Sequence, residues 1–297
     1  MKIKKSVLLF FVDGLGIGER SEHNPLTFIK DESPIAFFKN EETEVIESGI
    51  MTITDAQLGI SGRPQSASGQ TTILTGINAP ATLGFHKNGF PNRLLAELLR
   101  KHSVFLKLKQ MKVSDLVFAN AYTPQFFESE PRWKSATTLA VEAAQLPFRT
   151  IEDLKARGAL YHDFTNQILL ERGFDVPLFS ASDAAQILAS LTYENSFVLY
   201  EHFITDLIGH AQDLKKAIGH LSQLSEFLVE LLKRIDSDKT TVILTSDHGN
   251  IEDLSIRTHT LNNVPTVIWG RKKEQVAAKI KNLTDITPAI IELLRDE

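Results

Sequence analysis

The feature that most constrains this 297-residue chain is a set of short apolar runs that alternate with amphipathic segments. Runs rich in Val, Ile, Leu and Phe are typical of strands buried on both faces of a parallel sheet. Alternation with helical patterns indicates βαβ units. The sequence therefore predicts an α/β fold with a doubly wound, mostly parallel sheet flanked by helices. The expected strands are Ser6–Val12, Ser114–Ala121, Ser196–His202 and Thr240–Ser246, with Val264–Gly270 as a fifth and Thr43–Thr52 as a weaker sixth.

Helical periodicity is clearest in three segments. Leucines recur at helical spacing in Arg93–His102, and apolar residues recur through Ala211–Ile235. A last helix runs through Leu294, and we expect Thr284-Asp285 to cap it, with Pro288 in its first turn.

Residues 125–186 interrupt the alternation of strands and helices. They contain helical patches at Ser135–Gln145, Thr150–Arg157 and Asp163–Arg172 and no strong buried strand. We interpret them as a small cap or insertion in a catalytic core made of residues 1–124 and 187–297. The alternative is that they are ordinary crossover helices of the core.

Composition excludes several classes of protein. A net charge of −5 and a pI near 6.0 argue against a nucleic-acid partner, which requires a basic face. The absence of cysteine excludes disulfides, thiolate-bound metals and thiol nucleophiles. The basic start Met1–Lys5 mimics a signal peptide, but the apolar run after it is short and fits a buried strand better. No stretch has the ~20 apolar residues of a membrane span.

We therefore expect a cytoplasmic protein without a membrane partner.

Three acidic residues follow the predicted buried strands. Asp13 and Asp247 come directly after a strand, and Asp206 lies a few residues past another. In open α/β sheets, ligands bind outside the carboxyl ends of the strands. A single aspartate at such a place is commonly a turn residue. Three of them, two with histidine neighbours, favour a binding site.

Histidines complete this pattern. Asp206 and His210 are four residues apart, His248 follows Asp247, and His259 lies in a nearby loop. Carboxylates and imidazoles are the donors expected for zinc or manganese, and six such ligands suffice for two divalent ions. We interpret the other histidines as surface or core-edge residues, with His202 the least secure: His23, His86, His102, His162, His202 and His220.

The segment Ser66–Gly76 has the pattern of a helix start after a loop. The amino end of a helix suits an anionic phosphoryl group, and a serine bound there to a divalent cation becomes a competent nucleophile. Alternatively, Ser66 is an N-cap residue without a catalytic role.

Together these motifs resemble the alkaline phosphatase superfamily, and within it the cofactor-independent phosphoglycerate mutase and phosphopentomutase branch. The resemblance implies that Asp206, His210 and His259 bind one metal. It implies that Asp13, Asp247 and His248 bind the other metal. It also implies that Ser66 lies between the two ions and is itself a metal ligand. The matching strings are D-G-L-G at Asp13, S-A-S-G-Q-T at Ser66, D-L-I-G-H at Asp206, S-D-H-G-N at Ser246 and H-T-L-N-N-V-P at His259.

The family register also selects the serine. The nucleophile of the family lies three residues before a glycine, and Ser66 precedes Gly69 by three. Ser68, Thr71 and Thr72 are therefore weaker candidates.

Two departures from the mutases concern the substrate. Ala67–Gln70 replaces the glutamate-valine-glycine-histidine stretch that follows the mutase serine. The mutases also carry a much larger inserted domain with basic residues that hold a sugar phosphate. We therefore expect a phosphatase or phosphodiesterase acting on a small phosphorylated substrate. A phosphomutase and a non-catalytic metal-binding relative are the alternatives. The basic residues of the insertion, none matched to a mutase ligand, are Arg132, Lys134, Arg149, Lys155, Arg157 and Arg172.

Overall fold

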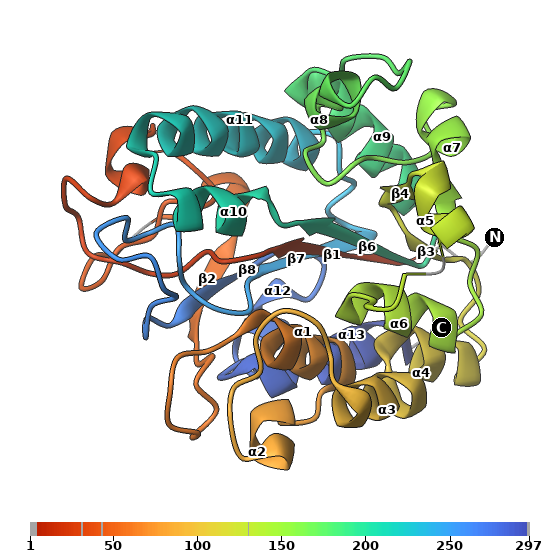
Figure 1. Cartoon of the computed structure of the whole chain (residues 1–297), viewed down its shortest axis with the longest axis horizontal. Helices are drawn as coiled ribbons and strands as arrows, with labels where there is room; N and C mark the ends of the chain where they lie inside the picture. Colours follow the sequence, from red (N-terminus) through yellow and green to blue (C-terminus); the bar gives the residue numbers. More distant parts are fainter. Residues whose placement is uncertain (1–4, 31, 43, 130, 296–297) are drawn as a thin grey trace.

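A computed structural model describes residues 5–30, 32–42, 44–129 and 131–295. Its centre is a six-stranded sheet with the order β2-β8-β7-β1-β6-β3 (Figure 1). The apolar runs form the central strands because burial on both faces removes most of their surface from water. The strands are β1 (Ser6–Val12), β2 (Ile50–Thr54), β3 (Leu116–Phe118), β6 (Phe197–His202), β7 (Thr240–Thr245) and β8 (Val264–Gly270).

The pairing of β1 sets the geometry of the site. β1 lies between β6 and β7 and runs parallel to both, with Phe11 opposite Glu201 on one side and Thr245 on the other. β3 also runs parallel to β6, whereas β8 is antiparallel to its neighbours β7 and β2. The sheet is therefore mixed, and the carboxyl ends of β1, β6 and β7 share one edge.

Helices cover both faces of the sheet (Figure 1). Alternate residues of β1 point into two separate cores, so Leu8 and Phe10 pack under one helical layer and Leu9 and Phe11 under the other. The layer over Phe10 includes α7 (Ile151–Lys155), α8 (Gln167–Glu171), α9 (Ala181–Glu194), α10 (Ile204–Ala211) and α11 (Leu214–Leu232). The layer over Phe11 includes α1 (Ser66–Thr75), α3 (Arg93–His102), α4 (Val104–Gln110), α6 (Ala136–Ala143), α12 (Lys273–Ala277) and α13 (Ile286–Arg295).

The structure confirms the predicted α/β class and most of the predicted elements. The strands at Ser6 and Val264 and the helix at Arg93 have the predicted bounds. None of the described helices is both long enough and apolar enough to cross a membrane.

Four boundaries were wrong. The run Ser114–Ala121 is divided between β3 and the two-residue strand β4 (Ala121–Tyr122). The sixth strand begins at Ile50, and Thr43 lies outside the described residues. Ala211–Ile235 is not one helix, because Gln212 adopts a left-handed conformation and ends α10. The cap of the last helical segment is the side chain of Asn282, which accepts from the backbone N–H of Thr284.

The regular structure of the segment 125–186 consists of short helices and one two-residue strand, separated by turns and loops. It contains α5 (Pro124–Ser129), α6, α7 and α8, and Arg149–Thr150 forms the short strand β5 paired with β4. The helix α6 packs against α1, α3 and α4 and contributes Leu139 to the core. Part of the segment thus lies within a helical layer of the core, and its division into a cap and a catalytic core stays a prediction.

Gly69 lets α1 approach the end of β7. A Cβ placed on Gly69 would lie 2.9 Å from both the Cβ and the carbonyl oxygen of Asp247, closer than real Cβ contacts. In contrast, Gly219 in α11 has open space where its Cβ would be.

These two glycines give a paired prediction for stability. Gly69→Ala should lower the free energy of unfolding by about 1–3 kcal/mol through overpacking. Gly219→Ala should raise it by up to about 1 kcal/mol, because alanine is the better helix former. Thermal unfolding of both variants measures the difference, and equal shifts would refute the close approach of α1 to β7.

Candidate metal centre and nucleophile

Six acidic and histidine side chains meet at the carboxyl edge of the sheet. Asp13 follows β1, and its backbone N–H continues the ladder by donating to the carbonyl of His202 at 2.9 Å. Asp247 and His248 follow β7. Asp206 and His210 lie one turn apart on α10, and His259 comes from the loop before β8. The structure thus brings together residues that are far apart in the sequence.

The first group surrounds the end of β1. His248 Nε2 lies 3.2 Å from Asp13 Oδ1 and 3.6 Å from Asp247 Oδ2. All three side chains are buried, and their donor atoms are close enough to hold one ion. This group is the set that the sequence predicts for one of the two metals.

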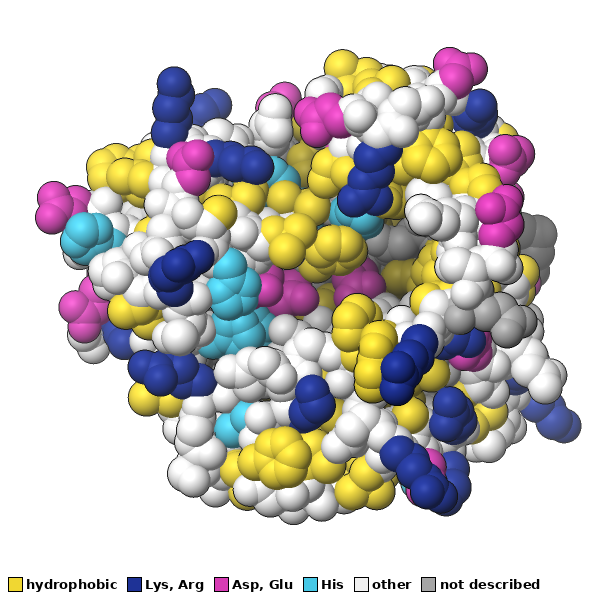
Figure 2. Space-filling model, viewed as in Figure 1, with side chains coloured by type: hydrophobic (Ala, Val, Ile, Leu, Met, Phe, Trp, Pro, Cys, Tyr) yellow, Lys and Arg dark blue, Asp and Glu magenta, His cyan; other side chains and the backbone are white. Residues whose placement is uncertain are grey.

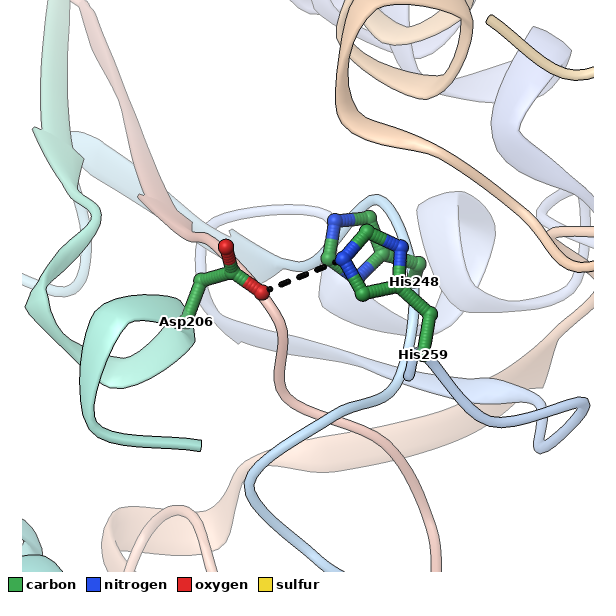
Figure 3. Close-up of side chains that lie close together, drawn as sticks. All are labelled: Asp206, His248 and His259. Atoms are coloured by element: carbon green, nitrogen blue, oxygen red, sulfur yellow. Dashed lines mark ion pairs between the residues drawn. The ribbon is translucent and has the colours of Figure 1, made fainter. Parts of the chain in front are cut away.

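The second group lies beside it. His259 Nε2 is 3.5 Å from Asp206 Oδ1, and His210 Nε2 is 3.1 Å from His259 Nε2 and 3.4 Å from Asp206 Oδ2. Figure 3 shows Asp206 on its helix, pointing at the two imidazoles of His248 and His259. Those rings stack with centroids 3.6 Å apart, so the two groups are contiguous.

The three histidines present the same nitrogen to the centre. Nδ1 of His210 lies 2.8 Å from the carbonyl of Arg257, and Nδ1 of His259 lies 2.9 Å from the carbonyl of Pro64. Nδ1 of His248 faces the carbonyl of Gly249 at 3.4 Å. A carbonyl only accepts, so these contacts assign a proton to Nδ1 and turn Nε2 toward the centre. Metal-binding histidines are commonly oriented in this way.

Ser66 is the first residue of α1, and its Oγ lies 3.0 Å from His248 Nε2. The other hydroxyls of this segment have structural partners. Ser68 donates to the Gln65 carbonyl and accepts from the Lys87 N–H. Thr71 and Thr72 donate to carbonyls one turn earlier in α1, those of Ala67 and Ser68.

Burial and mutual repulsion make the charges at this edge costly. Burial and the neighbouring Asp13 raise the pKa of Asp247 well above its ordinary value. Burial alone would lower the pKa of His248, but the carboxylates of Asp247 and Asp13 outweigh it and raise that pKa to about 10. The pKa of Asp206 falls despite its burial, because His259, His248 and Asn250 stabilise the carboxylate.

Two carboxylate oxygens at the end of β1 and β7 have no hydrogen-bond donor among the described residues: Asp13 Oδ1 and Asp247 Oδ2. Buried anionic oxygens are normally hydrogen-bonded or bound to a cation. These oxygens and the inward Nε2 atoms fit a pair of divalent cations, which makes metal binding the arrangement that satisfies the donor set.

The sequence analysis did not identify Glu252, whose hydrogen bonds connect the loops around the site. Its buried carboxylate accepts from the backbone N–H of Gly16 at 3.0 Å and of Asn250 at 2.7 Å. It also accepts from the side chains of Thr260 and Asn262 at 2.5 and 2.9 Å. Glu252 therefore holds the loop after β1 in register with the loops that carry the histidines. An acidic residue directly after an apolar Ile in the S-D-H-G-N loop is the signal that could have identified it.

Two amides position the carboxylates. Gln70 Nε2 donates to Asp13 Oδ2 at 3.0 Å, and Asn250 Nδ2 donates to Asp206 Oδ1 at 2.6 Å. Each amide holds one carboxylate oxygen.

The prediction that His202 is a surface or core-edge residue was wrong. Its side chain is fully buried, and its Nε2 lies 2.8 Å from Nε2 of His220. It points away from the metal centre because side chains alternate along β6.

A family model matches the carboxyl-terminal part of the chain. Residues 176–297 match the model described as "Metalloenzyme superfamily". This match covers less than half of the chain. Five of the six proposed metal ligands lie within the matched residues, and the sixth, Asp13, lies before them.

Curated relatives match parts of the chain. A 2,3-bisphosphoglycerate-independent phosphoglycerate mutase from Pyropia yezoensis is 25% identical over 75% of this chain and 39% of its own length. The enzyme of the same name from Ehrlichia ruminantium (strain Gardel) is 30% identical over 33% of this chain and 21% of its own length. These alignments thus span between about a fifth and two fifths of the relatives.

Solved structures share the fold of the chain along its whole length. A protein from Pyrococcus horikoshii has a TM-score of 0.60 at 16% identity, covering 100% of this chain and 99% of that one. The alkaline phosphatase of the Antarctic bacterium TAB5 has a TM-score of 0.55 at 15% identity, covering 100% of both chains.

A test of metal binding follows from the buried carboxylates. In chelator-treated protein, adding Mn²⁺ or Zn²⁺ at about a hundredfold excess over the dissociation constant should raise the free energy of unfolding by about 2.7 kcal/mol. Asp247→Asn should remove most of this increase without lowering the stability of the metal-free protein, because it deletes a buried charge. The exposed Asp175→Asn is the matched control and should keep the full increase. Thermal unfolding with and without metal measures the effect, and an unchanged increase in Asp247→Asn would contradict the assignment.

Glu201 gives a prediction for pH. Burial, opposed by a hydrogen bond from Thr137 and reinforced by Asp13, raises the pKa of Glu201 from 4.5 to about 7. The folded state therefore holds this proton more tightly than the unfolded state, and stability should fall as pH rises from 4.5 through 7. A shift of this size corresponds to about 3 kcal/mol. Denaturant unfolding of wild type and Glu201→Gln between pH 4.5 and 8 should diverge by that amount, with the wild type less stable at high pH. Parallel curves would show that the carboxyl is not perturbed.

Proposed function

We propose that the chain hydrolyses phosphate esters, monoesters or diesters, through a phosphoserine formed on Ser66. The observation that carries this proposal is the placement of Ser66 Oγ beside His248 Nε2, at the edge where all six acidic and histidine side chains meet. Two divalent cations, manganese or zinc, would supply Lewis-acid stabilisation of the phosphoryl oxygens and lower the pKa of the attacking hydroxyl. The site residues are proposed in their predicted roles: Asp206, His210 and His259 hold one ion, and Asp13, Asp247 and His248 hold the other.

The residues of the chain itself prepare the attack. The amino end of α1 places Ser66 where the positive end of the helix dipole favours an anionic phosphoryl group. Gln70 fixes Asp13, and Asn250 fixes Asp206, so both carboxylates stay oriented when substrate enters. Ser66 then forms a bond to phosphorus as the bond to the ester oxygen breaks, and the leaving alcohol takes a proton. Water subsequently attacks the phosphorus and breaks its bond to Ser66 Oγ, which releases inorganic phosphate from a monoester or a phosphate monoester from a diester.

The charges of the segment 125–186 support hydrolysis over isomerisation. A mutase must retain a dephosphorylated substrate and shield it from water, which calls for a lid with free charged contacts. The basic side chains here already have partners within the segment or next to it. Lys134 pairs with Glu142 at 2.6 Å, Arg149 with Asp153 at 3.6 Å, Lys155 with Asp175 at 3.9 Å and Arg157 with Asp183 at 3.0 Å, while Arg172 donates to Tyr161 and Arg132 lies over Trp133.

Phosphomutase activity is the second candidate, because the curated relatives are named as phosphoglycerate mutases. Product analysis distinguishes the two. With metal and a phosphosugar or phosphoglycerate, hydrolysis releases inorganic phosphate in step with substrate loss, whereas positional isomers without phosphate indicate the mutase. A chain that binds metal but turns over no ester, including an aryl phosphate, would be a non-catalytic relative.

The nucleophile is tested by a pair of serine variants. Ser66→Ala should reduce aryl phosphate turnover by at least about a thousandfold, the scale of losing an activated nucleophile. Ser68→Ala should keep turnover but lose about 1 kcal/mol of stability, because it removes hydrogen bonds to Gln65 and Lys87. Metal-replete initial rates and thermal unfolding of both variants provide the measurement. If Ser68→Ala is the inactive variant, Ser66 is not the nucleophile.

A further inference from the structure

A cavity of about 280 Å³ lies at the carboxyl ends of β3 and β6. Figure 2 shows this face of the molecule as hollowed, with acidic side chains in the hollow and hydrophobic side chains around it. Ligand pockets start at about 300 Å³, so the cavity suits a small group and not a nucleotide. We call it the aromatic pocket. Its lining residues include Phe118, Asn120, Tyr122, Phe126, Tyr161, His162, Glu201 and Phe203.

Aromatic rings form the walls of this pocket. Tyr122 and Phe126 lie with ring centroids 4.3 Å apart on one side. His162 stacks on Phe203 with ring centroids 4.0 Å apart, and its ring is tilted against that of Tyr161 with centroids 3.8 Å apart. Rings held by neighbouring rings offer fixed faces to a ligand.

Glu201 contributes the only acidic or basic side chain, other than histidine, among the described residues that line the pocket. Glu201 is 7% exposed, and its carboxylate accepts from the Thr137 hydroxyl at 2.8 Å. The Asn120 amide holds the backbone of Glu201 through two hydrogen bonds of 2.7 and 2.9 Å. The carboxyl is therefore fixed in a largely apolar surrounding.

Positive charge is lacking in the pocket itself. Burial, reinforced by Arg172, lowers the pKa of His162 to about 3, so its ring is neutral. Arg172 donates to the hydroxyl of Tyr161 and is not a lining residue, and Lys134 near the rim pairs with Glu142. A second phosphate or a carboxylate on the substrate would meet no cation here.

Short links connect the aromatic pocket with the metal centre. Glu201 lies opposite Phe11 in the sheet, and Phe11 is two residues before Asp13 in the sequence. Thr137, which donates to Glu201, and Gln70, which donates to Asp13, line the same small gap in the core. Phe203, which lines the pocket, is also the N-cap residue of α10, the helix that carries Asp206 and His210, so the pocket adjoins the metal centre.

We propose that the aromatic pocket binds the leaving group of the substrate and that this group carries a positive charge, as in a primary or quaternary ammonium alcohol. This proposal rests on the proposed phosphoesterase function. Aromatic faces and a carboxylate together form the kind of cage that recognises organic cations. A bound cation would also offset the burial that holds the pKa of Glu201 near 7.

The test compares two esters of nearly equal shape. Trimethylammonioethyl phosphate carries the cation, and 3,3-dimethylbutyl phosphate replaces its nitrogen with carbon. The ratio of kcat/KM for the charged over the uncharged ester should be at least about tenfold in the wild type, as expected for a desolvated cation–π contact. A ratio of one or less overturns the proposal.

Variants of the aromatic pocket then test whether it causes the preference for the charged ester. Glu201→Gln and Phe126→Leu should each reduce the ratio toward one, and a general loss of activity cancels because both esters are measured on the same variant. Glu97→Gln, an exposed residue of α3 that also loses one negative charge, is the matched control and should keep the wild-type ratio. An unchanged ratio in both pocket variants would place the recognition elsewhere and overturn the proposal.

A binding measurement separates this proposal from the proposed function. If no ester, including an aryl phosphate, is turned over, the phosphoesterase function fails. Calorimetric titration with trimethylammonioethanol and with 3,3-dimethylbutanol still tests whether the aromatic pocket binds an organic cation. Binding of the cation at least about tenfold tighter than the alcohol, lost in Glu201→Gln, supports the pocket. Equal binding, or binding of neither, overturns it.

Discussion

The burial of Asp13 and Asp247 at the ends of adjacent strands is the constraint on which the rest of the site depends. Each carboxylate has one oxygen without a hydrogen-bond donor, in a region closed to solvent. Water cannot compensate such charges, so a cation must. In the bare chain, His248 partly fills that role by taking up a proton, as its raised pKa indicates. Gln70 donates a hydrogen bond to Asp13, and backbone amides donate to Glu252. These hydrogen bonds hold the site in place against the repulsion between its carboxylates.

Two regions at the same edge of the sheet have different proposed roles. The metal centre and Ser66 would act on the phosphoryl group, and the aromatic pocket would select the alcohol. Phe11 lies between Thr245 and Glu201 in the sheet, so one strand, β1, separates the two regions. The side chains alternate across β6, which sends Glu201 toward Thr137 and His202 toward His220. One strand thus supplies both the pocket carboxylate and a buried core histidine.

Local sequence patterns predicted the parts of the fold that burial determines. The run Ser6–Val12 is apolar throughout and became the central strand, and the caps and leucines of Arg93–His102 defined a helix with the expected bounds. The positions of Asp13, Asp206 and Asp247 after strands predicted that these residues converge, because parallel strands share a carboxyl edge. What the sequence could not show were contacts between distant segments. Glu252 and Glu201 look like ordinary acidic residues in the chain, and their roles arise only when the loops and α6 pack around them.

Crystallography with anomalous scattering from manganese tests the central claim most directly. The account predicts two peaks about 3.5–4 Å apart, the spacing of two-metal phosphoryl-transfer sites. One peak should lie among Asp13, Asp247 and His248, and the other between Asp206 and the imidazoles of His210 and His259. Peaks away from these side chains, or a single ion bound at high manganese concentration, would contradict the two-metal account.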